Sequence, residues 1–290
     1  MKKYILLALL FFCFVSSFAC DICGCGVGNY YIGLLPQFSK SFLGLRYQIS
    51  SFSTNIKGNA SQYSKDLFET VEVWGGLNIG KRWQVLAMLP VNIISQVSDD
   101  GTFNRKGLGD IAVMASYKIF NNISATAGKK LIVQSVWIGG GIKLATGKFK
   151  INQSIPDLAA LANTQVGSGS TDFMINATYA ININRFGLST SGQYKINTTN
   201  PDKYYFGNKL SASSIGYYTF TAGKTTIAPN LGLMYAQNNV NRFLAVKVAG
   251  TNGYLLSTTA GVEVNFSKIA VGFNAQLPLS QNFANLQTRP

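Results

Sequence analysis

The sequence contains no histidine, and this absence excludes several kinds of chemistry. Without an imidazole there is no serine–histidine nucleophile pair, no histidine-ligated haem and no histidine-ligated metal site. Charged residues are also scarce, at 12% of the chain, about half of what an ordinary globular domain carries. We therefore do not expect an enzyme.

Long apolar runs are the second absence. Beyond the N-terminal segment no run approaches the roughly 18 apolar residues of a membrane-spanning helix. Hydrophobic residues nevertheless make up 47% of the chain, and glycine is abundant, at 29 residues. An exported chain with this composition is best explained by strands in which apolar and polar residues alternate.

The N-terminus has the organisation of a secretory signal. Lys2 and Lys3 are followed by the apolar stretch 5–15, and Ser17-Phe18-Ala19 offers small residues for cleavage before Cys20. We predict that residues 1–19 are a cleaved signal peptide and that the protein is exported to the outer membrane of a Gram-negative bacterium. Acylation of Cys20 is an alternative, although Ser17 and Phe18 depart from the usual lipoprotein motif.

The net charge is strongly positive, at +14 for the whole chain. The basic residues are scattered rather than clustered, and an exported protein rarely meets nucleic acid, so we do not expect a nucleic-acid partner. The anionic headgroups of outer-membrane lipids are the better match.

Apolar and polar residues alternate with a period of two along most of the chain, as expected when strands present one face to lipid. In segment 171–183, for example, Phe173 and Ile175 share one face, and Asp172 and Asn176 share the other. We predict an all-β fold, a transmembrane antiparallel up-and-down β-barrel of about 12 strands. Eleven strands are predicted directly, at 41–53, 67–79, 82–93, 108–120, 130–145, 171–183, 186–197, 207–222, 225–238, 254–266 and 268–279.

The predicted connections alternate between short and long, as in outer-membrane barrels. Short periplasmic turns are expected near 80–81, 121–128, 184–185, 223–224 and 267–268, and longer outer loops near 54–66, 94–107, 146–168, 198–206 and 239–252. Aromatic residues near the periplasmic strand ends are expected to form a girdle at the membrane interface: Phe42, Trp83, Phe120, Phe186, Phe220 and Phe266.

An odd number of strands is unusual, because bacterial single-chain barrels normally have an even number. The predicted domains are a periplasmic leader at 20–40 and a barrel at 41–290. We expect the native barrel to have a further C-terminal strand; the alternative is closure by segment 27–38 of the leader, which reads as a strand weakened by Pro36.

Several short stretches resemble one family of outer-membrane barrels, the family linked to the meta pathway of phenol degradation. They are Gly107-Leu108-Gly109-Asp110-Ile111 followed by Tyr117, segment 139–144 with Thr146-Gly147, Gly167-Ser168-Gly169-Ser170-Thr171-Asp172, and Leu277-Pro278-Leu279-Ser280-Gln281. The resemblance spans about 105–285 and depends on the order of these motifs.

This resemblance implies a channel distantly similar to the transport barrels for fatty acids and aromatic hydrocarbons, without naming a solute. Two departures from the family pattern stand out. Ala145 occupies a position where the family usually has proline, and we expect no counterpart of the family's final strand within the sequence up to Pro290.

Charged side chains on the polar faces of the strands are predicted to line the lumen. They could form a polar channel lining that sets selectivity, or a paired network that keeps the barrel shut. Asp110 and Asp172 lie beside glycines in the family motifs, which favours a structural role. The predicted lumen-lining residues are Arg46, Glu72, Arg82, Asp110, Lys118, Lys143, Asp172, Lys195 and Glu263.

Three cysteines, Cys20, Cys23 and Cys25, lie within six residues at the mature N-terminus. Thiolates this close together could bind Cu(I) or Zn(II), whereas oxidation in the periplasm would pair two of them and leave one free. Apart from this candidate Cu(I) site we expect no cofactor. Two hypotheses therefore remain: a passive channel for small, apolar or aromatic solutes, and a barrel that handles copper through its leader.

Overall fold

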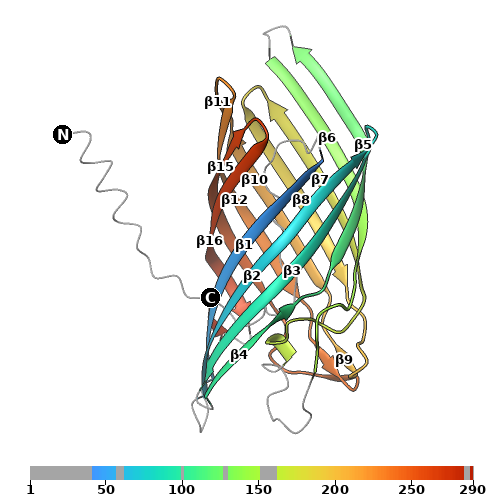
Figure 1. Cartoon of the computed structure of the whole chain (residues 1–290), viewed down its shortest axis with the longest axis vertical. Helices are drawn as coiled ribbons and strands as arrows, with labels where there is room; N and C mark the ends of the chain where they lie inside the picture. Colours follow the sequence, from blue (N-terminus) through green and yellow to red (C-terminus); the bar gives the residue numbers. More distant parts are fainter. Residues whose placement is uncertain are drawn as a thin grey trace, which may run out of the picture.

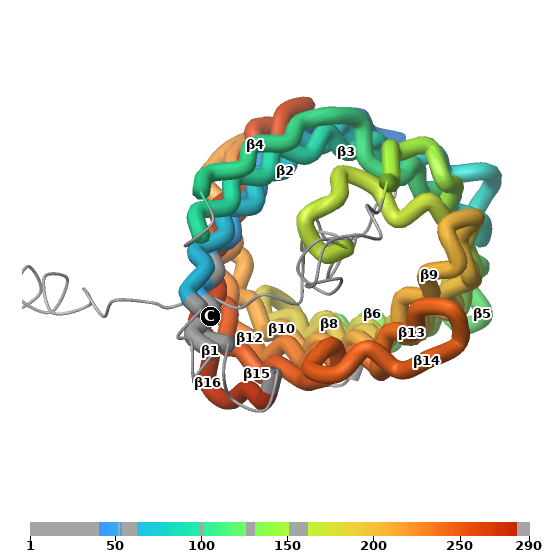
Figure 2. The backbone as a smooth tube through the Cα atoms, turned by 90° about the horizontal axis from the view of Figure 1, so that it is seen from below, coloured from blue at the N-terminus to red at the C-terminus, as the bar shows by residue number. Residues whose placement is uncertain are grey.

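The computed structural model describes residues 41–56, 62–98, 101–126, 130–150, 162–283 and 288–289. Its main feature is one antiparallel sheet of 14 strands, in the order β16-β15-β12-β10-β8-β7-β6-β5-β3-β2-β1-β17, with β4 added to β3 and β11 to β12. Each long strand is paired with its neighbours in sequence, as in an up-and-down meander. The sheet is strongly curled, so that β1 and β16 come to the same side of the ring seen in Figure 2.

All eleven predicted strands are present. They are the strands of ten or more residues: β1 (Phe42–Ile56), β2 (Gln62–Ile79), β3 (Trp83–Ser98), β5 (Ala112–Thr126), β6 (Lys130–Lys143), β7 (Asp172–Ile183), β8 (Phe186–Ile196), β10 (Lys209–Tyr218), β12 (Thr225–Asn238), β15 (Gly253–Phe266) and β16 (Ile269–Phe283). The strands are tilted relative to the long axis of the molecule (Figure 1), as curling into a barrel requires. No helix among the described residues is long and apolar enough to cross a membrane.

The two faces of the sheet differ as the alternation predicts. Apolar side chains such as Leu45, Ile175 and Val271 are exposed on the outer face, although they are large and hydrophobic. On the inner face, Asp172 and Thr259 are fully buried. Exposed apolar surface over a whole sheet face is unusual for a protein in water and fits a face that contacts lipid.

Several segments that were predicted as loops contain strands, so the predicted limits of these loops are wrong. Strand β3 extends to Ser98 and forms a hairpin with β4 (Gly101–Leu108), where a loop at 94–107 was expected. Gly101 has a φ of 124°, which other residues rarely adopt, so it permits the change of direction before β4. The expected outer loops 198–206 and 239–252 contain a small second sheet made of β9 (Tyr204–Tyr205), β13 (Arg242–Phe243) and β14 (Val246–Lys247).

The turn expected at 121–128 is also misplaced. Strand β5 continues to Thr126 and stays paired with β6, which begins at Lys130. The register shifts between Lys118 and Phe120, and this irregularity lets both Ile119 and Phe120 be exposed. The β5–β6 hairpin therefore rises above the other short turns (Figure 1). The turns at 80–81, 184–185, 223–224 and 267–268 are where the sequence predicts them.

A short strand lies on the free edge of β1. In β17 (Thr288–Arg289), Thr288 pairs with Thr54 and Arg289 with Ser53, antiparallel to β1. Among the described residues no ladder joins β16 directly to β1. The predicted signal peptide (1–19) and the predicted leader (20–40), with its segment 27–38, lie outside the described residues.

Candidate functional site: an inner loop held by a buried lysine

The long connection between β6 and β7 folds back inside the ring of strands. Figure 2 shows its described part, 162–171, as a yellow-green trace within the ring. Two contacts with the barrel wall hold it there: Asn92 of β3 donates a hydrogen bond to the carbonyl oxygen of Val166 (2.7 Å), and the guanidinium of Arg105 of β4 donates to the carbonyl oxygen of Thr164 (3.1 Å). We call residues 144–150 and 162–171 the inner loop.

Lys143, the last residue of β6, anchors this loop. Its ammonium nitrogen lies 2.6 Å from Oδ2 of Asp110 and 3.0 Å from Oδ2 of Asp172, and it also donates to the carbonyl oxygen of Ser170 (3.0 Å) and to the hydroxyl of Ser168. The Lys143 side chain is only 1% exposed, so both ion pairs are shielded from water. A buried ammonium is tolerated when it is paired and hydrogen-bonded in this way.

Asp110 joins the loop to the wall from the other side. Its Oδ2 accepts hydrogen bonds from the backbone N–H of Ser168 (2.8 Å) and from the Ser168 hydroxyl (2.6 Å), and its Oδ1 accepts from the backbone N–H of Gly147 (3.0 Å). A carboxylate that accepts backbone hydrogen bonds from both arms of a loop fixes their separation. The inner loop is therefore held by a specific geometry and not only by contact area.

Two glycines bring the arms of the inner loop together. A Cβ atom added to Gly147 would lie 2.6 Å from the Cα of Gly167, and one added to Gly167 would lie 2.5 Å from the Cα of Gly147. No side chain fits between backbones at this distance, so both positions require glycine. These are the glycines of the Thr-Gly and Gly-x-Gly-Ser motifs.

An aromatic cluster covers the outer end of the inner loop. Phe149 and Ala162 of the loop pack with Tyr204 and Phe206, and Phe243 joins them from the β12–β15 connection. Tyr204 is fully buried, and its hydroxyl accepts a hydrogen bond from the Asn241 side chain (2.9 Å). Three connections are thereby joined to each other at one end of the barrel.

Beside this cluster, the side chain of Tyr205 remains a hydrogen-bond donor. Burial raises the pKa of its phenol, and the nearby Arg242, which lies 5.9 Å from the ring centre, lowers it in part. The neutral hydroxyl donates to Oδ1 of Asn208 (2.8 Å).

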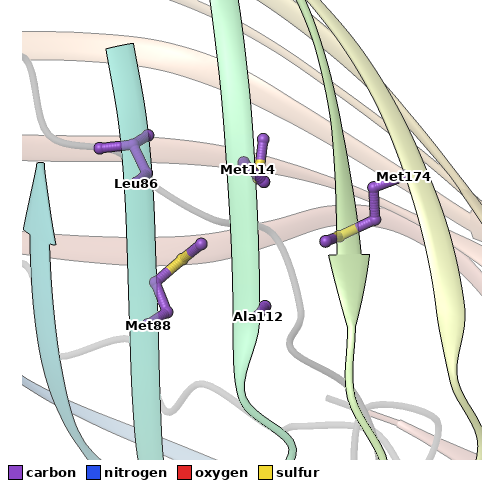
Figure 3. Close-up of a cluster of buried hydrophobic side chains, with 5 residues drawn as sticks. All are labelled: Leu86, Met88, Ala112, Met114 and Met174. Carbon is purple, nitrogen blue, oxygen red and sulfur yellow. The ribbon is translucent and has the colours of Figure 1, made fainter. Parts of the chain in front are cut away.

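The inner wall also carries an apolar patch that the sequence did not reveal. Leu86, Met88, Ala112, Met114 and Met174 are buried together on strands β3, β5 and β7, with Phe42 and Trp74 packed against them. Figure 3 shows the side chains of Met88, Met114 and Met174, which belong to β3, β5 and β7; strand β6 lies between β5 and β7. Phe42 is thus part of this inner packing, and its expected place in the aromatic girdle at the periplasmic membrane interface is wrong.

The other predicted lumen charges occupy different settings. Arg46 forms an ion pair with Glu72, and its guanidinium carbon lies 5.3 Å from the ring centre of Trp74. Lys118 lies over the ring of Trp137, 4.6 Å from its centre.

Lys195 and Glu263 are buried on the inner face. Arg82 is not brought together with these charges: it lies in the exposed β2–β3 turn, and its guanidinium donates to the hydroxyl of Tyr117 (2.9 Å), a residue of the outer face. Arg82 lies in the turn before β3, where side chains no longer alternate between the two faces of the sheet. The alternation pattern therefore assigned it to the lumen incorrectly.

Two charged residues of the inner wall were missed. Asp66 is fully buried, and neither of its carboxylate oxygens has a hydrogen-bond partner. Asp66 lies on the same face of β2 as Glu72, because the two are an even number of residues apart. It was missed because the predicted strand began at residue 67. Lys209 is the first residue of β10 and is also buried; the parity of that strand would have revealed it.

Cys20, Cys23 and Cys25 lie outside the described residues. Within the described ranges, no three histidine, cysteine or acidic side chains gather in a way that could hold a metal ion. The Cu(I) site at the leader therefore stays a prediction.

The fold and the inner loop together define a class: an all-β protein whose strongly curled antiparallel sheet resembles the barrel of an outer-membrane channel. The chain belongs to the family described as "Putative MetA-pathway of phenol degradation", which matches residues 46–284. This confirms the resemblance carried by the sequence motifs.

A comparison with a solved outer membrane channel supports the fold. An outer membrane channel from Pseudomonas putida F1 is similar with a TM-score of 0.57 at 13% sequence identity, over 84% of this chain and 91% of that one. CdiB from Escherichia coli gives a TM-score of 0.38 at 14% identity, over 86% of this chain and 49% of that one. No curated protein matches the sequence.

Proposed function

We propose that this protein is a passive outer-membrane channel for small, apolar or aromatic solutes. The observation that carries the proposal is the opposite character of the two faces of one curled sheet. The outer face exposes large apolar side chains along its strands, which suits lipid, whereas the inner face carries paired charges and a folded inner loop. A wall of this kind separates a solute path from the membrane.

The inner loop gives this path its narrow part. Because the loop lies inside the ring and is fixed by Lys143, Asp110 and Asp172, it reduces the open cross-section at one end of the barrel. Backbone that crosses a barrel in this way determines which solutes pass by size and by the polarity of its surroundings. The apolar patch below it favours solutes with a hydrophobic body.

Conductance in planar lipid bilayers tests the proposal. The full-length protein should give discrete current steps, and vesicles that contain it should swell in solutions of small neutral aromatic solutes faster than in sugars of similar size. The matched variant is Lys143→Met, which should increase the conductance because the inner loop is released. Absence of current steps and of swelling for both proteins would favour a filled, closed barrel and contradict a channel.

A further inference from the structure

The four short turns that the structure describes, at 80–82, 184–185, 223–224 and 267–268, share one local structure. In each, the first residue has a φ between 54° and 66°, and the next residue is lysine or arginine. Tight hairpin turns need a positive φ, which glycine and asparagine adopt most readily. Each turn therefore places an exposed basic residue at its tip. The pairs are Gly80-Lys81, Asn184-Arg185, Gly223-Lys224 and Ser267-Lys268.

All four turns lie at the same end of the barrel, because they are alternate connections of an antiparallel meander. The inner loop, β4 and β9 lie at the opposite end (Figure 1). Arg82 adds a second basic residue to the first turn, so the four turns hold five basic residues and no acidic one. Lysine and arginine make up only 25 of the 290 residues of the chain, so basic residues are concentrated here. We call Lys81, Arg82, Arg185, Lys224 and Lys268 the basic rim.

The charges of the basic rim face outward from the protein. All five residues are exposed, and none of them forms an ion pair with a residue that the structure describes. Exposed charges of one sign attract a surface of the opposite sign over about 8 Å at physiological ionic strength. The basic rim therefore favours an anionic surface that lies at this end of the barrel.

Exposed aromatic side chains mark the depth of the basic rim. Trp83 and Phe186 each directly follow a rim residue, and they are 50% and 49% exposed. Phe220 and Phe266 lie close to the other two turns and are exposed to a similar extent. Large aromatic rings on the lipid-facing surface gather at the level of the headgroups. The rim residues, next to these rings, lie where lipid phosphate groups are found.

The contacts of Arg82 show how a rim residue is held at this level. Its guanidinium donates a hydrogen bond to the hydroxyl of Tyr117 (2.9 Å), and the guanidinium carbon lies 6.0 Å from the centre of the Tyr117 ring. The ring of Trp83 packs against that of Tyr117, with 4.9 Å between the ring centres. A cation held beside two rings of the outer face is directed to the lipid side of the wall. Arginine is well suited to phosphate, because its guanidinium offers several N–H donors in one plane.

We propose that the basic rim binds the anionic phospholipids of the periplasmic leaflet, whose acyl chains then lie along the apolar outer face. Short turns of such barrels face the periplasm, and each basic residue near an anionic membrane surface strengthens the attraction about fivefold. This inference concerns the outside of the barrel and does not depend on the channel proposal. Because the contact requires an anionic lipid, changes at the rim have no effect in vesicles of zwitterionic phosphatidylcholine.

Native mass spectrometry of the full-length protein in detergent measures lipid binding without requiring an open pore. Phosphatidylglycerol and phosphatidylcholine with the same acyl chains are matched probes, because they differ in the net charge of the headgroup. The protein should bind phosphatidylglycerol about tenfold more tightly, and the preference should decrease as the ionic strength rises. Equal affinities for the two lipids, or a preference that salt does not change, would overturn the inference.

Two triple variants locate the binding at one end of the barrel. The rim variant combines Lys81→Gln, Arg185→Gln and Lys268→Gln; it should lose most of the preference for phosphatidylglycerol and bind phosphatidylcholine as the wild type does. The control variant removes the same charge at the opposite end and should retain the preference. It replaces three exposed lysines by glutamine: Lys106, Lys203 and Lys247. Equal losses in the two variants would show an effect of net charge alone and contradict the role of the rim.

Peptidoglycan is another anionic surface on the periplasmic side, and sedimentation of the full-length protein with isolated peptidoglycan tests it. The wild type and the rim variant should sediment to the same small extent. Retention by peptidoglycan that the rim variant loses, together with equal affinities for the two lipids, would assign the rim to the cell wall and refute the lipid proposal.

Discussion

Replacing Lys143 by methionine should be among the most destabilising single changes at the inner loop. Methionine has a similar length and fits a strand, but it removes the ammonium group that lies within 3.0 Å of both buried carboxylates, Asp110 and Asp172. Breaking a buried ion pair by removing one partner costs about 3–5 kcal/mol, because the other charge is left uncompensated. Asp110 retains hydrogen bonds from Ser168 and Gly147, so we expect a loss near the lower end of this range.

Urea unfolding of the protein reconstituted in lipid vesicles, followed by tryptophan fluorescence, measures this loss. Lys224→Met is the matched control: it removes a lysine from an exposed turn and should change the free energy of unfolding by no more than about 0.5 kcal/mol. The double variant Lys143→Met with Asp110→Asn should recover part of the loss, because it removes one of the uncompensated charges. A Lys143→Met protein as stable as the Lys224→Met control would refute the view that the lysine holds the inner loop.

Three further predictions test other parts of the molecule. Ile175→Arg, on the exposed apolar face, should destabilise the assembled barrel by about 2–4 kcal/mol, and its inner-face neighbour Asn176→Arg should be better tolerated in the same unfolding assay; equal losses would contradict the assignment of the two faces. Gly147→Ala should destabilise the protein by about 1–3 kcal/mol because the added carbon meets Gly167, whereas Gly192→Ala, with nothing within 4 Å, should be nearly neutral; the reverse order would be inconsistent with the close contact. A reduced synthetic peptide of residues 20–30 should bind about one Cu(I) through Cys20, Cys23 and Cys25 in competition with a copper chelator, and failure to compete at micromolar copper would argue against the copper hypothesis.

The strands were predictable because each presents one face to an apolar environment and the other to the interior. Residues such as Phe173 and Ile175 alternate with Asp172 and Asn176, and a shift of one residue would exchange the two faces, so the register is strongly specified. The pattern fails where the two faces of a strand do not have different environments. In the β3–β4 hairpin Val97 pairs with Thr102, and Phe103 pairs with Gln96. Both Val97 and Phe103 are exposed, and periodicity does not distinguish such a local hairpin from a loop.

The candidate site was predictable in its members and not in its arrangement. Lys143, Asp110 and Asp172 could be assigned to the inner face, but the contact between Lys143 and Ser168 depends on how a connection of more than twenty residues folds back into the barrel. No local pattern encodes that path. The apolar patch was missed for a different reason: Met114 and Met174 are far apart in the sequence, and only the inner-face register of the strands brings them together.

Strand β6 links the inner loop to the apolar patch. Gly141 lies beneath the Met114 side chain, and Lys143, two residues further on the same face, holds Asp110 and Asp172. Asp172 in turn begins β7, two residues before Met174, whose direct partner is Lys195. A change at Lys143 therefore reaches the apolar patch through two adjacent strands. We expect Lys143→Met to lower the stability of the barrel and to change its conductance, whereas Gly147→Ala, which acts on the loop alone, should change conductance with a smaller loss of stability.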